Sequence, residues 1–155
     1  MNSPSLLRAA ALFAGLLGLV PPALAQTPAL NPPAARISDR AIHADYQTYE
    51  QAQARIKALN DGGRPLRDYH LAKAQCWLDA SFHEYSRNDR SAFPQQALDQ
   101  SLNLVLLMEQ KAASLPMDTP LVNEADRLRP DLWAQADTLK AHAGRACVAQ
   151  RVACA

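Results

Sequence analysis

Apolar residues recur at helical spacing along most of this chain, and the strict alternation that marks a strand is almost absent. A first helix is predicted to begin near Ile37, with Ser38 as its N-cap, and to end at the Asn-Asp-Gly-Gly sequence of residues 60–63. One face of this helix carries its apolar residues, which are Ile42, Tyr46, Tyr49, Ile56 and Leu59.

A second helix is predicted from Pro65 and Asp68, which suit a first turn, to about Arg87. It carries two apolar stripes. One consists of Leu71, Leu78, Phe82 and Tyr85, and the other of Tyr69, Ala72, Cys76 and Ala80. Because a helix with two apolar stripes must bury two faces, we expect it at the centre of a bundle.

A third helix is predicted from about Ala92 to Ala113, with Ser91 as its cap. Its segment 102–108 is apolar nearly all round. Such a segment is either deeply buried or presents an exposed patch to a partner. On the second alternative, the candidate partner surface consists of Leu104, Leu107 and Met108.

The remaining third of the chain predicts a loop over residues 114–123, with a short helical turn possible at 122–128. Pro130 and Asp131 then begin another helix, which Gly144 ends. Residues 146–155 resemble the opening of a further helix without a stop signal, so we expect the helical domain, residues 37–155, to be incomplete at its C-terminus. The predicted fold is an all-α antiparallel bundle of four to five helices, with a short helical-hairpin solenoid as the alternative.

The N-terminus has the pattern of a secretory signal peptide, residues 1–25. Arg8 provides the positive region, residues 9–20 form an apolar run too short to span a bilayer, and Ala-Leu-Ala at 23–25 is a cleavage signal. Residues 26–36 contain three prolines and predict an extended tether. The mature chain has no further apolar run long enough for a transmembrane helix, so we expect a periplasmic protein that associates with the outer membrane or remains free of it.

Charge argues against one class of partner. Removing 25 residues from 155 leaves 130, and Arg8 is the only charge removed, so 15 basic side chains balance 15 acidic ones. Nucleic-acid binding needs a basic surplus gathered on one face. The sequence therefore predicts no nucleic-acid partner.

Two groups of segments resemble the N-terminal helical region of proteobacterial OmpA-family envelope proteins. The first is Tyr-His-Leu-Ala-Lys-Ala-Gln-Cys-Trp-Leu-Asp at 69–79, continued by Glu-Tyr-Ser-Arg-Asn-Asp-Arg at 84–90. The second is Leu-Arg-Pro-Asp-Leu-Trp at 128–133 with Leu-Lys-Ala-His at 139–142 and the pair Cys147 and Cys154. The resemblance covers about two thirds of the mature chain.

Members of that group place a peptidoglycan-binding OmpA-like domain after the helices. The resemblance therefore implies an exported module that works beside the outer membrane and the cell wall. The ligand-binding Asp and Arg of the OmpA-like domain have no counterpart here, because residue 155 is the last of this sequence. We expect either a fragment or truncated homologue, or a helical module that works alone.

Three cysteines in an oxidising compartment predict one disulfide and one spare thiol. Within one helix, Cys147 and Cys154 would lie about 10.5 Å apart, which is too far to bond. A bond between them therefore requires Cys147 to lie outside the helix, and this is the pair we favour. A bond from Cys76 to either of them, or no disulfide, remains the alternative.

No arrangement of residues points to catalysis, so we predict a protein that is not an enzyme and needs no cofactor. No HExxH, CxxC or GxSxG motif occurs. Asp79 and His83 stand one turn apart and are weak metal candidates, but a solvated pair on a helix face is the better interpretation. The aromatic residues stand at helical spacing and predict core packing rather than a stacking platform.

The sequence favours a non-catalytic envelope module that contacts other envelope proteins or cell-wall components. The alternative is a periplasmic binder of a small ligand or metal, using a pocket between the second and third helices.

Overall fold

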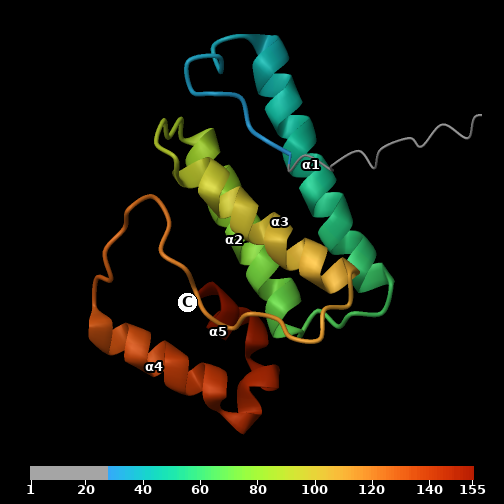
Figure 1. The fold of residues 1–155 in the computed structure, drawn as a ribbon, viewed down its shortest axis with the longest axis vertical. Helices are drawn as coiled ribbons and strands as arrows, with labels where there is room; N and C mark the ends of the chain where they lie inside the picture. The colour runs from blue at the N-terminus through green and yellow to red at the C-terminus, as the bar shows by residue number, and fades with distance from the viewer. Residues whose placement is uncertain (1–27) are drawn as a thin grey trace, which may run out of the picture.

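The computed structural model describes residues 28–155, and every regular element in this part of the chain is helical (Figure 1). Five α-helices and one 3-10 helix follow in the order α1 Asp39–Asp61, α2 Tyr69–Ser86, α3 Phe93–Glu109, α4 Pro130–Ala141, η1 Ala143–Cys147 and α5 Ala149–Cys154. The predicted all-α class is therefore confirmed for these residues. None of these helices is long and apolar enough to cross a membrane. The predicted signal peptide lies outside the described residues.

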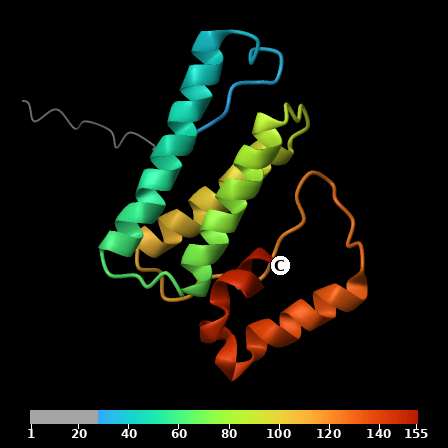
Figure 2. The same cartoon turned by 180° about the vertical axis from the view of Figure 1, so that it is seen from behind.

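Helices α1, α2 and α3 form an antiparallel bundle with α2 at its centre (Figures 1 and 2). The predicted cap of α1 is confirmed, because Ser38 accepts a hydrogen bond from the Ala41 N–H. Helix α2 begins at Tyr69, later than the predicted start at Pro65, and Asp68 is its N-cap and accepts from the Leu71 N–H. Ser91 plays a different part from the one expected. Its hydroxyl accepts from the Phe93 N–H, and α3 begins two residues after it.

The centre of α3 is buried, which corrects the expectation of a partner surface there. Leu104 and Met108 are only 5% and 2% exposed, and Leu107 is half-buried. The physical reason is that α3 packs against both α1 and α2, which covers most of its apolar side chains and leaves Leu106 44% exposed. The core that α3 shares with the other two helices includes Ala52, Ile56, Leu71, Ala74, Leu78, Leu98, Leu102 and Val105.

The segment from Pro28 to Arg36 also differs from the expected tether. Leu30 is buried in the core, and its backbone N–H donates to Gln95 of α3 at 2.7 Å. Residues 33–37 form turns rather than an extended strand. The prolines exclude a helix, as predicted, but they do not prevent one apolar side chain from inserting between α1 and α3.

A buried carboxylate holds this segment in place. Asp45 of α1 is fully buried and accepts from both the backbone N–H and the side-chain amide of Asn31, at 2.7 and 2.9 Å. The Tyr85 hydroxyl donates to its other oxygen at 2.9 Å, and Arg36 Nε lies 3.8 Å from that oxygen. Burial, and then the hydrogen bond to Asp45, raise the pKa of Tyr85 above its ordinary value. The carboxylate is therefore paired and hydrogen-bonded, as a buried charge must be.

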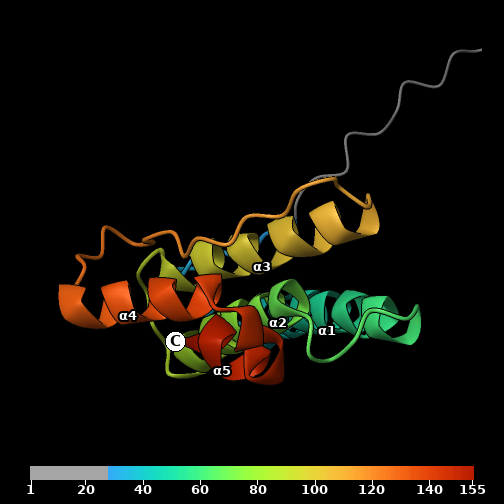
Figure 3. The same ribbon diagram turned by 90° about the horizontal axis from the view of Figure 1, so that it is seen from below.

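The last third of the chain is less tightly packed. Helix α4 begins at Pro130, as predicted, and contacts α5 and η1. The expected helical turn at 122–128 is absent, and that stretch contains only an isolated turn. Figure 3 shows α4 and α5 on the side of α2 away from α1.

Replacing Asp45 with alanine should destabilise the fold by about 3–5 kcal/mol, because it leaves the largely buried Arg36 without its carboxylate and the Asn31 backbone N–H and the Tyr85 hydroxyl without their acceptor. Urea unfolding measures this change. Asp61→Ala, which removes an exposed ion pair with Lys57 from the same helix, is the matched control and should cost less than about 1 kcal/mol. Equal losses in the two variants would contradict the assigned role of Asp45.

Candidate functional site

A disulfide joins α5 to α2, and its partners correct the favoured pairing. Cys154 bonds to Cys76, with Cα atoms 5.4 Å apart and 78 positions between them in sequence, while Cys147 is free and exposed. Cys147 does leave the last helix, as the expected pair required, but it lies on η1 with its side chain exposed. Cys76 is therefore not the spare thiol that the favoured pairing implied.

The physical reason for this pairing is the packing of α5 on α2. Ala149, Val152 and Ala153 of α5 are buried against Tyr69 and Ala72 of α2. Cys76 lies one turn beyond Ala72, so this packing brings it beside Cys154. Cys76 belongs to the second apolar stripe noted in the sequence, and α5 is the element that covers that stripe.

The same face of α2 fixes the long loop that precedes α4. The Tyr69 hydroxyl donates to the carbonyl oxygen of Met117 at 3.0 Å, and the Met117 side chain packs on the α2–α5 cluster. Burial raises the pKa of Tyr69, so the hydroxyl stays protonated at neutral pH and remains a donor. The loop is thereby held opposite α4.

A cleft of about 470 Å³ lies between this loop, α4 and α5. Its volume falls within the range of roughly 300–1,000 Å³ typical of small-molecule sites. Most of its lining is apolar and consists of Leu128, Leu132, Trp133, Ala136, Leu139 and Val152. We call this cavity, with its lining residues, the α4 cleft.

Helix α4 turns its apolar side chains to this cleft without burying them. None of its 12 residues is buried. Leu132 and Leu139 are 48% and 50% exposed, and Leu128, just before the helix, is 79% exposed. Contiguous exposed apolar side chains of this kind are typical of an interaction site.

A buried lysine supports the polar wall of the cleft. Lys73 of α2 is 5% exposed, and its ammonium donates to the hydroxyl of Thr119, a lining residue, at 2.7 Å. No carboxylate among the described residues lies within 4.0 Å of this ammonium. Burial, and next the nearby Lys140, lower the pKa of Lys73 to about 8, against a smaller opposing effect of Asp118. A buried lysine with a strongly lowered pKa beside a cleft is a functional-site candidate.

Two charged residues line the α4 cleft, and both are cations. Lys140 and Arg129 lie on its wall, paired with Asp137 at 3.0 Å and with Asp131 at 2.7 Å respectively. Hydrogen bonding to Asp131 raises the pKa of Arg129. Arg127 stacks on the ring of Trp133 with its guanidinium carbon 4.6 Å from the ring centre. Both acidic partners are well exposed, so these are surface ion pairs, which contribute little stability.

The candidate metal residues do not come together. Asp79 accepts from Gln75 at 2.8 Å, and His83 lies 3.8 Å from Glu84 instead of bonding to Asp79. Among residues 28–155 no three metal-ligating side chains are close enough to hold an ion. Of the aromatic rings near Asp79, Tyr49 and Tyr85 are buried, as core packing predicts. Tyr46 and Phe82 pack edge to face with these rings but stay 40% and 37% exposed, so the prediction of core packing holds only in part.

Sequence reasoning missed the residues that build the α4 cleft. Lys73 stands on the apolar stripe between Tyr69 and Cys76, and a cation on such a stripe was the available signal. Thr119 gave no signal, because it lies in a loop whose path depends on tertiary contacts. The pocket expected between the second and third helices is instead packed, with Ser101 of α3 donating to the Ala74 carbonyl at 2.8 Å.

Comparisons with family models, with curated proteins and with solved structures found no match to this chain.

Removing the disulfide should lower the melting temperature of the oxidised protein. Cys154→Ser opens a loop of 78 residues, whose closure the chain-entropy relation estimates to stabilise the fold by about 4.5 kcal/mol, so a loss of several degrees or more is expected. Cys147→Ser is the matched control and should melt like the wild type, and a reducing agent should abolish the difference between the variants. Equal destabilisation by Cys147→Ser and Cys154→Ser would contradict the Cys76–Cys154 bond and support the Cys147–Cys154 pair.

Lys73→Met should stabilise the protein at pH 7, because it removes a buried charge while keeping the length of the side chain. The Lys73 pKa is about 8 in the folded protein and 10.5 as its reference value, so the unfolded chain binds more protons between these limits. Wild-type stability therefore rises with pH across this window, and the advantage of the variant should shrink from pH 8 to pH 10.5. Thermal unfolding of both proteins at several pH values measures this difference in stability. Lys57→Met, at an exposed lysine, serves as control. A stability difference between Lys73→Met and the wild type that does not change with pH would refute the burial argument.

Proposed function

We propose that this chain is an exported, non-catalytic helical module of an OmpA-like envelope protein, and that it contacts the outer membrane or cell wall through the α4 cleft. The observation that carries the proposal is the unburied apolar side of α4, which faces a cavity of small-molecule size. The expected partners are other envelope proteins or cell-wall components. The contact surface is thus assigned to α4, in place of the buried α3 positions.

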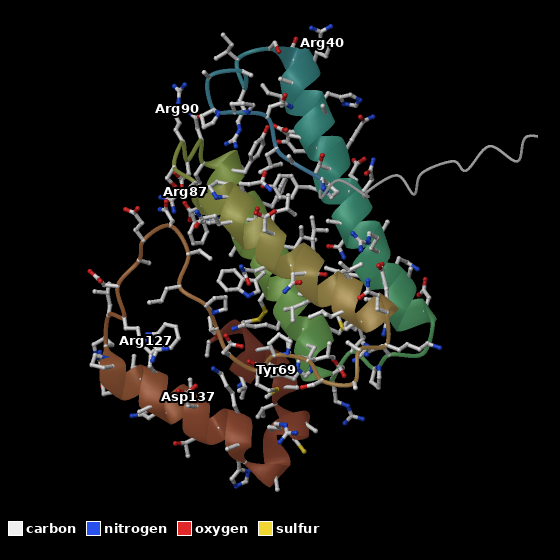
Figure 4. All side chains as sticks on the ribbon, viewed as in Figure 1. Arg40, Tyr69, Arg87, Arg90, Arg127 and Asp137 are labelled. Carbon is white, nitrogen blue, oxygen red and sulfur yellow. A yellow bond between two sulfur atoms is a disulfide. The ribbon has the colours of Figure 1, made fainter. Side chains whose placement is uncertain are left out.

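The resemblance to the OmpA-family helical region supports this choice of surface. Segment 69–79 contributes Tyr69, Lys73 and Cys76 to the region behind the cleft, and segments 128–133 and 139–142 contribute much of its lining. Figure 4 places Tyr69 of α2 across from Asp137 of α4, while Arg40 lies at the far end of α1. Segments 69–79, 128–133 and 139–142 therefore surround a single place in the structure, whereas segment 84–90, with Arg87 and Arg90, lies at the other end of α2 (Figure 4).

Export is part of the proposal and rests on the signal-peptide pattern of residues 1–25. The Cys76–Cys154 bond supports it, because disulfides persist in oxidising compartments such as the periplasm.

A second candidate function is the binding of a free small ligand in the periplasm. The volume and apolar lining of the α4 cleft favour it. We retain the small-ligand form of this candidate and not the metal form, because the two metal candidates, Asp79 and His83, do not share a site.

Co-sedimentation tests the contact function. The purified protein is mixed with outer-membrane fragments or with purified peptidoglycan sacculi, and the pelleted fraction is measured. Leu132→Asp combined with Leu139→Asp should weaken binding at least about tenfold, because each carboxylate would have to be desolvated at the contact. Both positions are half-exposed on α4, so circular dichroism should show unchanged helix content.

Ile37→Asp is the matched control, since Ile37 is an exposed apolar residue outside the cleft, and it should bind like the wild type. Equal pelleting of the double variant and the wild type would place the contact elsewhere. A wild-type protein that pellets with neither material would refute the contact function.

A further inference from the structure

We propose that the α4 cleft binds a free single-chain anionic amphiphile, with its alkyl chain along the leucines of α4 and its carboxylate beside Thr119 and Lys140. This inference rests on the second candidate function and names its ligand class.

The apolar part of the cleft is elongated. Leu132 and Leu139 stand seven residues apart, which places them on the same side of α4 with about 10 Å of helix between them. Val152 of α5 and Leu128 before the helix line the same cavity. Side chains arranged along a helix in this way match a linear chain better than a compact ring, and covering them removes exposed apolar surface from water.

The polar part of the cleft offers a hydrogen-bond donor. Thr119 Oγ1 accepts from the Lys73 ammonium at 2.7 Å, and no acceptor for its own proton is found among the described residues. A hydroxyl carries one donor as well as acceptor lone pairs, so this arrangement directs the proton of Thr119 to another acceptor. The positive charge of Lys73 behind Thr119 strengthens such a hydrogen bond. A ligand group that accepts this proton, such as a carboxylate, therefore fits beside Thr119.

Charge complementarity points the same way. The charged residues that line the cavity, Lys140 and Arg129, are both cationic. The Lys140 side chain is 11% exposed, whereas its partner Asp137 is 60% exposed on the outer side of the pair. A ligand carboxylate can therefore share or replace this weak surface pair at small cost. An amphiphilic cation could neither accept a hydrogen bond from Thr119 nor pair with Lys140.

The test uses isothermal titration of the oxidised protein with three ligands of equal chain length, each below its micelle concentration. Dodecanoate should bind with one molecule per chain. The uncharged 1-dodecanol should bind at least about tenfold more weakly, and dodecyltrimethylammonium more weakly still. Because this comparison uses only the wild-type protein, it does not depend on the folding of a variant. Equal affinity for dodecanoate and dodecanol, or no binding of dodecanoate, would overturn the proposal.

Variants locate the site. Lys140→Met should weaken dodecanoate at least about tenfold and leave dodecanol unchanged, whereas Lys57→Met, on α1 outside the α4 cleft, should change neither. Leu132→Asp combined with Leu139→Asp should abolish binding of both ligands. Undiminished dodecanoate binding by that double variant would place the site elsewhere and overturn the proposal.

Vesicles of phosphatidylglycerol distinguish the binding of a free ligand from binding to a membrane surface. Binding to these vesicles without binding of dodecanoate would identify a bilayer as the partner and overturn the proposal. If dodecanoate does not bind but co-sedimentation with envelope material still depends on the two leucines, this inference fails alone. If the protein neither binds dodecanoate nor co-sediments with envelope material, both this inference and the contact function fail.

Discussion

The covalent link between Cys76 and Cys154 is the constraint on which the C-terminal third of this protein depends. Helix α5 has six residues, well below the roughly 12–15 that an isolated helix needs, and buries only Ala149, Val152 and Ala153. Helix α4 in turn contacts only α5 and η1 among the helices with substantial contacts. The position of the α4 cleft therefore follows from a single bond to the middle of α2, together with the loop contacts of Tyr69 and Lys73.

Two buried charges illustrate different uses of polar groups inside this fold. Asp45 is satisfied by Asn31, Tyr85 and Arg36, and it orders a segment that has no secondary structure of its own. Lys73 donates to one hydroxyl and lies 5.8 Å from the centre of the Trp77 ring, and burial lowers its pKa. The first arrangement holds the bundle together. The second costs stability and places positive charge behind the wall of a cavity.

The sequence could predict what local chemistry determines. Ser38, Asp68 and Pro130 act within one helical turn of themselves, so the starts of α1, α2 and α4 could be inferred from them. The two stripes on α2 likewise predicted its central position. The disulfide could not be predicted in the same way, because its partners are 78 positions apart and meet only through the packing of α5. The burial of Leu30 and the place of Thr119 depend in the same way on contacts distant in sequence.

The disulfide also determines how the protein carries mechanical load. A force applied at Ala155 enters the fold next to Cys154 and passes through the sulfur bridge directly to Cys76, in the middle of α2. All residues between the two cysteines, α3 and α4 among them, lie inside the covalent loop and are bypassed by the tension. The covalent path from this end therefore runs through the first half of α2 and through α1, while α4 and the loop before it lie off that path.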